Sequence, residues 1–154
     1  MKIFVDSSIL VEHVKGAQID FIPYCTAQSL PLYIDTTVVS EFLFQVLAIR
    51  DNKSPLTLKR KELIASSLDY TNTNRFLKQF SVLSNGAEVA AEAPTLMAKH
   101  NLLPNDAIIL ATCIHHAIPY LASYDTNDFA TACQAEGVTL LDDVAAAQQH
   151  LTRP

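Results

Sequence analysis

Short apolar segments recur along this chain, and each is followed by a stretch with the periodicity of a helix. The segments are residues 2–5, 32–34, 81–83, 120–123 and 138–141. Buried strands that alternate with helices form parallel sheets whose two faces are both covered. We therefore predict an α/β fold with three layers, α/β/α, around a central parallel sheet of about four to five strands.

Helix signals fill the intervals between these strands. Apolar periodicity and capping residues predict helices from Ser7 to a stop at Gly16, over 17–30 with an interruption near Pro23, over 37–50, 57–70, 73–80 and 86–99, onward from Pro104, and over 125–135 with a stop at Gly137. Thr36 or Thr37 is expected to cap the helix over 37–50. Pro94 is expected to kink or break the helix that contains it.

Size and composition indicate one packed domain, which we place at residues 1–150 of the 154. Hydrophobic residues make up 49% of the chain and charged residues 18%. No apolar run approaches the ~20 residues that span a bilayer, and no signal peptide opens the sequence, so we expect a soluble, cytoplasmic protein. Cys25, Cys113 and Cys133 are odd in number and widely spaced, which favours reduced core thiols over disulfides or a zinc site.

Several carboxylates are expected at one edge of the sheet. Asp6 directly follows the first strand, and Asp125 and Asp128 follow the strand at 120–123. Asp106 lies in the first turn of the helix that begins at Pro104. Parallel sheets bind their ligands at the carboxyl ends of the strands, so these acids fall where a site would form.

Each acid also has a purely structural explanation. Asp6, Asp106, Asp125 and Asp128 could cap a helix or favour its first turn. Glu41 is harder to explain, because it borders an apolar helix surface and no Lys or Arg lies within one turn of it. A divalent cation shared by all five acids would relieve their mutual repulsion and explain them together.

The donor atoms of such a site indicate its metal and its chemistry. Oxygen ligands with room for water suit Mg²⁺ or Mn²⁺. Two such ions, ~3.5–4 Å apart, can clamp the attacking and leaving oxygens of an in-line displacement at phosphorus. In that chemistry the acids would hold metal and activate water, while Ser7, Ser123 or Asn105 would position a water or a phosphate.

Four motifs, in chain order, resemble those of the PIN-domain family, particularly the small VapC-like ribonuclease toxins of type II toxin–antitoxin systems. They are IFVDSSILVE with Asp6, TTVVSEFLFQV with Glu41, LLPNDAIILATC with Asp106, and LASYDTNDF with Ser123 in the hydroxyl position and Asp125 as the fourth acid. Some relatives carry Asn where Asp125 stands, so Asp125 and Asp128 both stay candidates for the fourth acid.

The resemblance implies a Rossmann-like PIN fold and an endoribonuclease that hydrolyses RNA with a metal-activated water and depends on Mg²⁺ or Mn²⁺. It implies catalytic roles for Asp6, Glu41, Asp106, Ser123 and Asp125, and metal binding by the acids among them together with Asp128. A homodimer and an antitoxin partner that covers the site are also implied. Two alternatives stay open: a catalytically inactive module of this fold that binds RNA or protein, and a solitary PIN nuclease in RNA processing.

The net charge of −5 is opposite in sign to that of a chain that binds RNA by overall charge. Five carboxylates at one site account for much of it. Six of the 11 Lys and Arg residues lie within residues 53–78: Lys53, Lys59, Arg60, Lys61, Arg75 and Lys78. They form either an electrostatic track for phosphates or the solvated face of surface helices. A dinucleotide-binding loop is excluded, because no glycine-rich motif follows the first strand.

Overall fold

The computed structural model describes residues 1–16 and 21–151. All five predicted strands form, and they lie parallel in one sheet of order β3-β2-β1-β4-β5. They are β1 (Ile3–Val5), β2 (Leu32–Asp35), β3 (Ser81–Leu83), β4 (Tyr120–Ala122) and β5 (Thr139–Leu141). The prediction of a central parallel sheet is confirmed.

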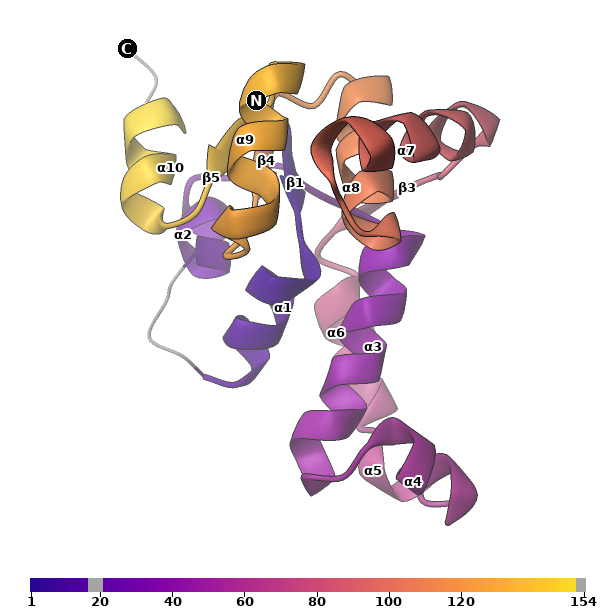
Figure 1. Ribbon diagram of the computed structural model, residues 1–154. Helices are drawn as coiled ribbons and strands as arrows, with labels where there is room; N and C mark the ends of the chain where they lie inside the picture. Colours follow the sequence, from indigo (N-terminus) through magenta and orange to yellow (C-terminus); the bar gives the residue numbers. More distant parts are fainter. Residues whose placement is uncertain (17–20, 152–154) are drawn as a thin grey trace.

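Helices fill the connections between the strands and follow the last strand (Figure 1). They are α1 (Ser7–Val14), α2 (Phe21–Ala27), α3 (Thr36–Asp51), α4 (Pro55–Arg60), α5 (Ile64–Ser67), α6 (Tyr70–Leu77), α7 (Ala87–His100), α8 (Pro104–His115), α9 (Thr126–Glu136) and α10 (Val144–Leu151). Because crossovers between parallel strands are right-handed, the connections that contain α1–α6 lie on one side of the sheet and those that contain α7–α9 on the other. Within the first group, α4 and α5 pack on α3 at its end far from the sheet. Within the described residues, none of these helices has the length and apolar character to cross a membrane.

The direction of the chain across the sheet reverses at its centre. From β1 the chain moves to β2 and then to the edge at β3, and it returns past β1 to β4 and β5. The ends of β1 and β4 lie together, and the N–H of Asp6 donates to the carbonyl of Ala122 at 2.9 Å. Open parallel sheets bind ligands in the crevice at such a reversal. The strand order alone therefore places the residues that follow β1 and β4 side by side.

The core explains why the strands are continuous apolar runs. All three residues of β1, Ile3–Val5, are 0% exposed, because helices cover both faces of the sheet. The thiols of Cys25, Cys113 and Cys133 are free and buried, as predicted. Burial raises the pKa of Cys25 and of Cys133 to about 12, so both thiols are protonated core groups.

The start of α3 differs from the prediction. Its N-cap is Asp35, not Thr36 or Thr37, and Oδ1 of Asp35 accepts the N–H of Val38 at 2.9 Å. Aspartate is among the strongest N-cap residues, because its short carboxylate reaches the free N–H groups of the first turn. The residue that ends β2 therefore also begins α3.

Neither Pro94 nor Pro23 breaks its helix within the described residues, so the two predicted breaks were wrong. Pro94 lies inside α7, which is continuous over 14 residues. Its neighbours Ala93 and Leu96 are buried and α7 packs along α8, so packing offsets the hydrogen bond that proline removes. Pro23 lies in the first turn of α2, where proline is tolerated. The part of that predicted helix at 17–20 lies outside the described residues.

The helix predicted over 57–70 is two helices, α4 and α5. Glu62, between them, has a φ of 56°, in the left-handed region where helices end. The next helix, α6, begins at Tyr70, earlier than predicted, because Asp69 accepts the N–H of Asn72 at 3.1 Å and caps it.

A last helix, α10, was not predicted. Asp143 precedes it and accepts the N–H of Ala146 at 2.6 Å. Ala147 and Leu151 are its buried residues. Packing through these two positions, more than a strong apolar stripe, holds the helix on the rest of the fold.

A buried carboxyl group links α3 to α8. Asp35 is 0% exposed, and its Oδ2 accepts the hydroxyl of the equally buried Thr112 on α8 at 3.0 Å. Burial raises the pKa of Asp35, although hydrogen bonds from Val38 and Thr112 oppose the shift. Because α3 carries Glu41 and α8 carries Asp106, this contact fixes the two acid-bearing helices relative to each other.

Replacing Asp35 with Ala should lower the free energy of unfolding by about 2 kcal/mol, because it removes a helix cap and a buried hydrogen bond between two helices. Urea titration measures the loss. Asp69→Ala is the control, since it removes the same kind of cap at the start of α6, together with an exposed ion pair to Arg50, and should cost less. Equal losses for the two variants would show that the link to α8 adds no stability.

Candidate active site

Asp6 is held at the end of β1 by donors from two parts of the chain. Its Oδ1 accepts the N–H of Ser7 at 2.7 Å, and its Oδ2 accepts the hydroxyls of Ser8 at 2.6 Å and Ser123 at 2.8 Å. Asp6 is also the N-cap of α1 and is 5% exposed. Asp6 therefore has both roles that the sequence allowed: it caps a helix, and it lies where the strand order reverses.

The same hydroxyls hold the segment that follows β4. The Oγ of Ser8 accepts the N–H of Tyr124 at 3.1 Å, and the Oγ of Ser123 accepts the N–H of Asp125 at 3.0 Å. A hydroxyl has one proton to donate and lone pairs to accept, so each serine can make both of its bonds at once. Asp6 and the Asp125 segment are therefore fixed to each other through two side chains.

Glu41 reaches the same edge from α3. The hydroxyl of Ser7 lies 3.0 Å from Oε2 of Glu41 and 3.4 Å from Oδ1 of Asp6, and so stands between the two acids. The amide of Asn105, at the start of α8, donates to Oε1 of Glu41 at 2.6 Å. The lone acid on an apolar helix thus has polar partners, and they come from the segments that carry Asp6 and Asp106.

Asp106 shows most directly that the acids converge. Burial raises its pKa to about 6, and the negative charges of neighbouring carboxylates contribute to the rise. In decreasing order of effect these carboxylates are Asp128, Asp6, Glu41 and Asp125. The other four acids predicted from the sequence therefore all lie close enough to Asp106 for their charges to act on it.

Asp125 and Asp128 differ in their surroundings. Asp125 occupies the N-cap position of α9, yet its side chain makes no capping hydrogen bond there, and it is exposed. Asp128 lies in the first turn of α9, is half-buried, and affects the pKa of Asp106 more than any other carboxylate does. The capping explanation for Asp125 is therefore not what the structure shows.

The donor set fits a hydrated divalent cation. Every side-chain donor that the five acids offer is an oxygen, and the ion pairs recorded among the described residues involve none of the five. In residues 1–16 and 21–151, no three His, Cys, Asp or Glu side chains are close enough to hold one ion directly. Mg²⁺ commonly contacts one or two carboxylates and keeps several waters, so this wider spacing suits it.

Three polar side chains were predicted to have a different role from the contacts seen here, and Ser8 was not predicted at all. Ser7, Ser123 and Asn105 were expected to position a water or a phosphate, but here their side chains hydrogen-bond to Asp6 and Glu41. Sequence reasoning did not select Ser8, although a second hydroxyl directly after the acid that ends a strand was an available signal.

The surface near these acids is hollowed. A cavity of about 330 Å³ is lined by Glu41 and Asn105 together with Ser40, Phe44 and Gln45. The cavity is therefore open to Glu41 and to Asn105, the residue that hydrogen-bonds to it.

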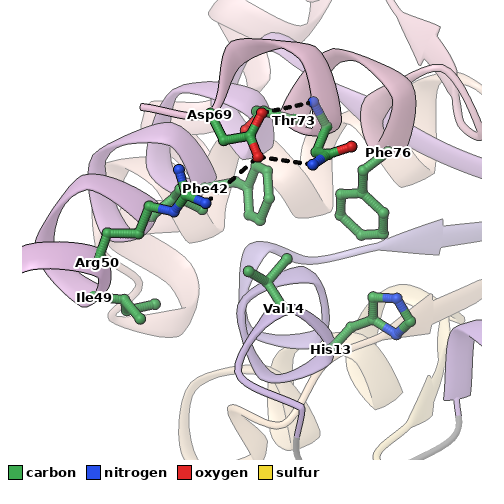
Figure 2. A pocket seen from close by; sticks show the side chains of 10 residues that line it. His13, Val14, Phe42, Ile49, Arg50, Asp69, Thr73 and Phe76 are labelled. Atoms are coloured by element: carbon green, nitrogen blue, oxygen red, sulfur yellow. Dashed lines mark hydrogen bonds and ion pairs between the residues drawn. The ribbon is translucent and has the colours of Figure 1, made fainter. Parts of the chain in front are cut away.

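A separate groove of about 290 Å³ lies between α1, α3 and α6 (Figure 2). Phe42 and Phe76 belong to its apolar lining, and Val14 and Ile49, also on its wall, are 46% and 37% exposed. Arg50 pairs with Asp69 at 3.5 Å on its rim. None of the five acids lines this groove.

Comparisons with known proteins agree with the four motifs. The profile of the PIN domain matches residues 3–134. Ribonuclease VapC2 of Methanocaldococcus jannaschii is 32% identical over 130 residues, which cover 83% of this chain and 87% of that protein. Ribonuclease VapC6 of the same organism is 30% identical over 139 residues, which cover 81% of this chain and 89% of that protein.

Solved structures share the fold. A chain from a toxin–antitoxin complex of Klebsiella pneumoniae matches with a TM-score of 0.57 and 21% sequence identity, over 82% of this chain and 89% of its own length. At this identity the match supports the architecture alone.

Replacing Asp106 with Asn should stabilise the metal-free protein at pH 7. The pKa of Asp106 rises from 3.8 to about 6 on folding, so between these values the folded chain holds more protons than the unfolded chain. Stability is therefore lost as pH rises through this window, and the loss is complete above about pH 6. The Asn side chain does not ionise, and we expect a gain of about 1 kcal/mol at pH 7 after solvent screening.

Thermal unfolding at pH 4 and pH 7, with a chelator present, measures this effect. The advantage of Asp106→Asn should shrink toward zero at pH 4. Asp142→Asn, at an exposed aspartate, is the control and should change little at either pH. An Asp106→Asn variant that is no more stable than the parent at pH 7 would contradict a repulsive cluster.

Proposed function

Because the chain belongs to the PIN-domain family, we propose that it is a metal-dependent endoribonuclease and the toxin of a toxin–antitoxin pair. The observation that carries this proposal is the convergence of four carboxylates on Asp106, with Asp6 held among them by hydroxyl groups. The relatives named ribonucleases share about a third of their sequence with this chain over most of both lengths.

Asp6, Asp106 and Asp128 are the acids that we propose as the main metal-binding residues, with Glu41 and Asp125 completing the set. PIN-domain ribonucleases of the VapC kind generally depend on a divalent metal, and oxygen donors favour Mg²⁺ or Mn²⁺. When bound, such an ion supplies charge neutralisation at the phosphate and an activated water for hydrolysis. We favour Asp128 over Asp125 as the fourth acid because its charge acts more strongly on Asp106.

The other polar residues keep these acids in place. Ser123 is fully buried, so its hydroxyl acts on Asp6 and not on a substrate in solution. Ser8 donates to the same oxygen of Asp6, Oδ2, and the amide of Asn105 donates to Glu41. Fixed carboxylates do not have to reorganise when the phosphate takes on charge, which is the usual source of catalysis in such sites. In this proposal Ser123 is therefore a positioning residue.

Exposed basic side chains away from the acidic edge could attract the phosphates of RNA. They lie on or beside α4 and α6 and are Lys53, Lys59, Arg60, Lys61, Arg75 and Lys78. In Figure 1, α4 lies at the end of α3 that is far from the sheet. A polyanion bound at the acids can be steered by this separate basic surface, and its binding should weaken as salt rises.

A protein partner has a candidate surface in the groove of Figure 2. A chain similar to this one occurs in a toxin–antitoxin complex. Exposed apolar side chains rimmed by polar ones are typical of surfaces that bind a partner. We propose that the antitoxin covers Val14 and Ile49 there. A homodimer and a cytoplasmic location, where free thiols stay reduced, complete the proposal.

Asp6→Asn should abolish RNA cleavage and also the rise in melting temperature that Mg²⁺ or Mn²⁺ gives the parent protein. The amide keeps the size of the side chain but loses the charge that attracts the cation. Cleavage of labelled RNA and a metal titration followed by thermal unfolding measure the two effects. Glu92→Gln, which removes one exposed charge from α7, should leave both unchanged.

A variant Asp6→Asn that cut RNA as well as the parent would overturn the nuclease assignment. RNA binding without cleavage by the parent, in the presence of either metal, would instead favour a binding module of the same fold.

Val14→Asp should weaken antitoxin binding at least about tenfold while RNA cleavage by the isolated toxin is unchanged. A charge in the groove would have to be buried beneath the partner. Co-purification with the small protein encoded by the neighbouring gene measures binding. Val82→Asp is the control, because Val82 is 56% exposed on β3 and lies outside the groove. Equal recovery of the partner with both variants would place the antitoxin elsewhere.

A further inference from the structure

A second cavity begins at the residue that holds Asp6. Its volume is about 480 Å³, and it is lined by Ser8, Val11, Glu12, Lys15, Gln45 and Tyr124. Ser8 donates to Asp6 at 2.6 Å, so the cavity starts one hydrogen bond from the acids. Gln45 also lines the cavity that contains Glu41 and Asn105. A chain-like ligand seated at the acids can therefore extend into this space.

Tyr124 forms the aromatic wall of the cavity and is fixed to the site. Its N–H donates to Ser8 at 3.1 Å, and its neighbours in sequence are Ser123, which holds Asp6, and Asp125. The side chain is half-buried and packs against the core, which limits its motion.

The remaining walls suit a neutral, planar group better than a phosphate. Glu12 and Lys15 form an ion pair at 2.7 Å, so their charges largely cancel. Gln45 is exposed and offers both donors and an acceptor. Unpaired RNA bases are recognised in this manner, by stacking on an aromatic ring and by hydrogen bonds to their edges.

We propose that this cavity is a base-binding subsite for a nucleotide next to the cleaved phosphodiester bond. The base stacks against Tyr124, and its edge faces Gln45. This inference rests on the proposed ribonuclease function, and it adds a specificity-determining contact that the acids cannot supply, since they act on the phosphate that every nucleotide shares. The competing explanation is that Tyr124 only packs against the core.

The test couples a change in the protein to a change in the RNA. The substrates are an RNA with a mapped cleavage site and two versions of it that lack the base on one or the other side of that site. The parent should lose about tenfold in kcat/KM on one of the two abasic RNAs, the size expected for one stacked base. Tyr124→Leu should lose about tenfold on the intact RNA and no further on the abasic one.

Two further variants separate stacking from packing. Tyr124→Phe keeps the ring and should cleave within about twofold of the parent. Tyr24→Leu removes another half-buried tyrosine, on α2 and outside the cavity. Its kcat/KM should fall about tenfold between the intact and the abasic RNA, as that of the parent does. Melting temperatures of all variants report whether any loss comes from unfolding.

Additive losses for Tyr124→Leu and the missing base would overturn the subsite, as would a parent protein indifferent to both abasic RNAs. Indifference of the parent protein is measured without any variant, so it does not depend on whether a variant folds. If the parent cleaves RNA with a metal but shows no coupling, the subsite alone is wrong. If it cleaves no RNA under any metal, the proposed function fails and the subsite fails with it.

Discussion

Repulsion among carboxylates gathered at one edge of a sheet is the constraint on which the rest of this structure depends. Asp106 carries its clearest sign, a pKa raised to about 6 by burial and by four neighbouring acids. Like charges that are brought together lower the stability of a fold unless other contacts hold them there. Those contacts include hydroxyls, the side-chain amide of Asn105 and the backbone N–H of Ser7. The ion pairs recorded among the described residues do not reach these acids. A site arranged in this way favours a cation.

The outline of the fold and the identity of the acids were readable in the sequence because both rest on local patterns. A strand buried on both faces must be largely apolar, so the buried strands β1, β2 and β4 stood out as short runs. The edge strand β3 is largely exposed, and only its short apolar run marked it. The ends of such strands are where parallel sheets form their sites, and Asp6 and Asp125 follow two of them. Glu41 was recognisable as an acid without a local partner.

The features that sequence reasoning missed depend on contacts between distant residues. Asp35 caps α3 and bonds to Thr112 on α8, and nothing in its local sequence shows that partner. Pro94 stays within a helix because α7 packs along α8, which outweighs a local preference to break. Ser8 was overlooked because its importance comes from Tyr124, 116 positions later in the chain.

The hydrogen bond between Ser123 and Asp6 joins residues 117 positions apart. On the ribosome, the first strand leaves the exit tunnel long before the residues that complete its acidic edge have been synthesised. The acidic edge of this chain therefore cannot assemble until Ser123 has emerged and the sheet has folded. An antitoxin of the proposed kind that binds the earlier helices could arrive during that interval, before the acidic edge is complete.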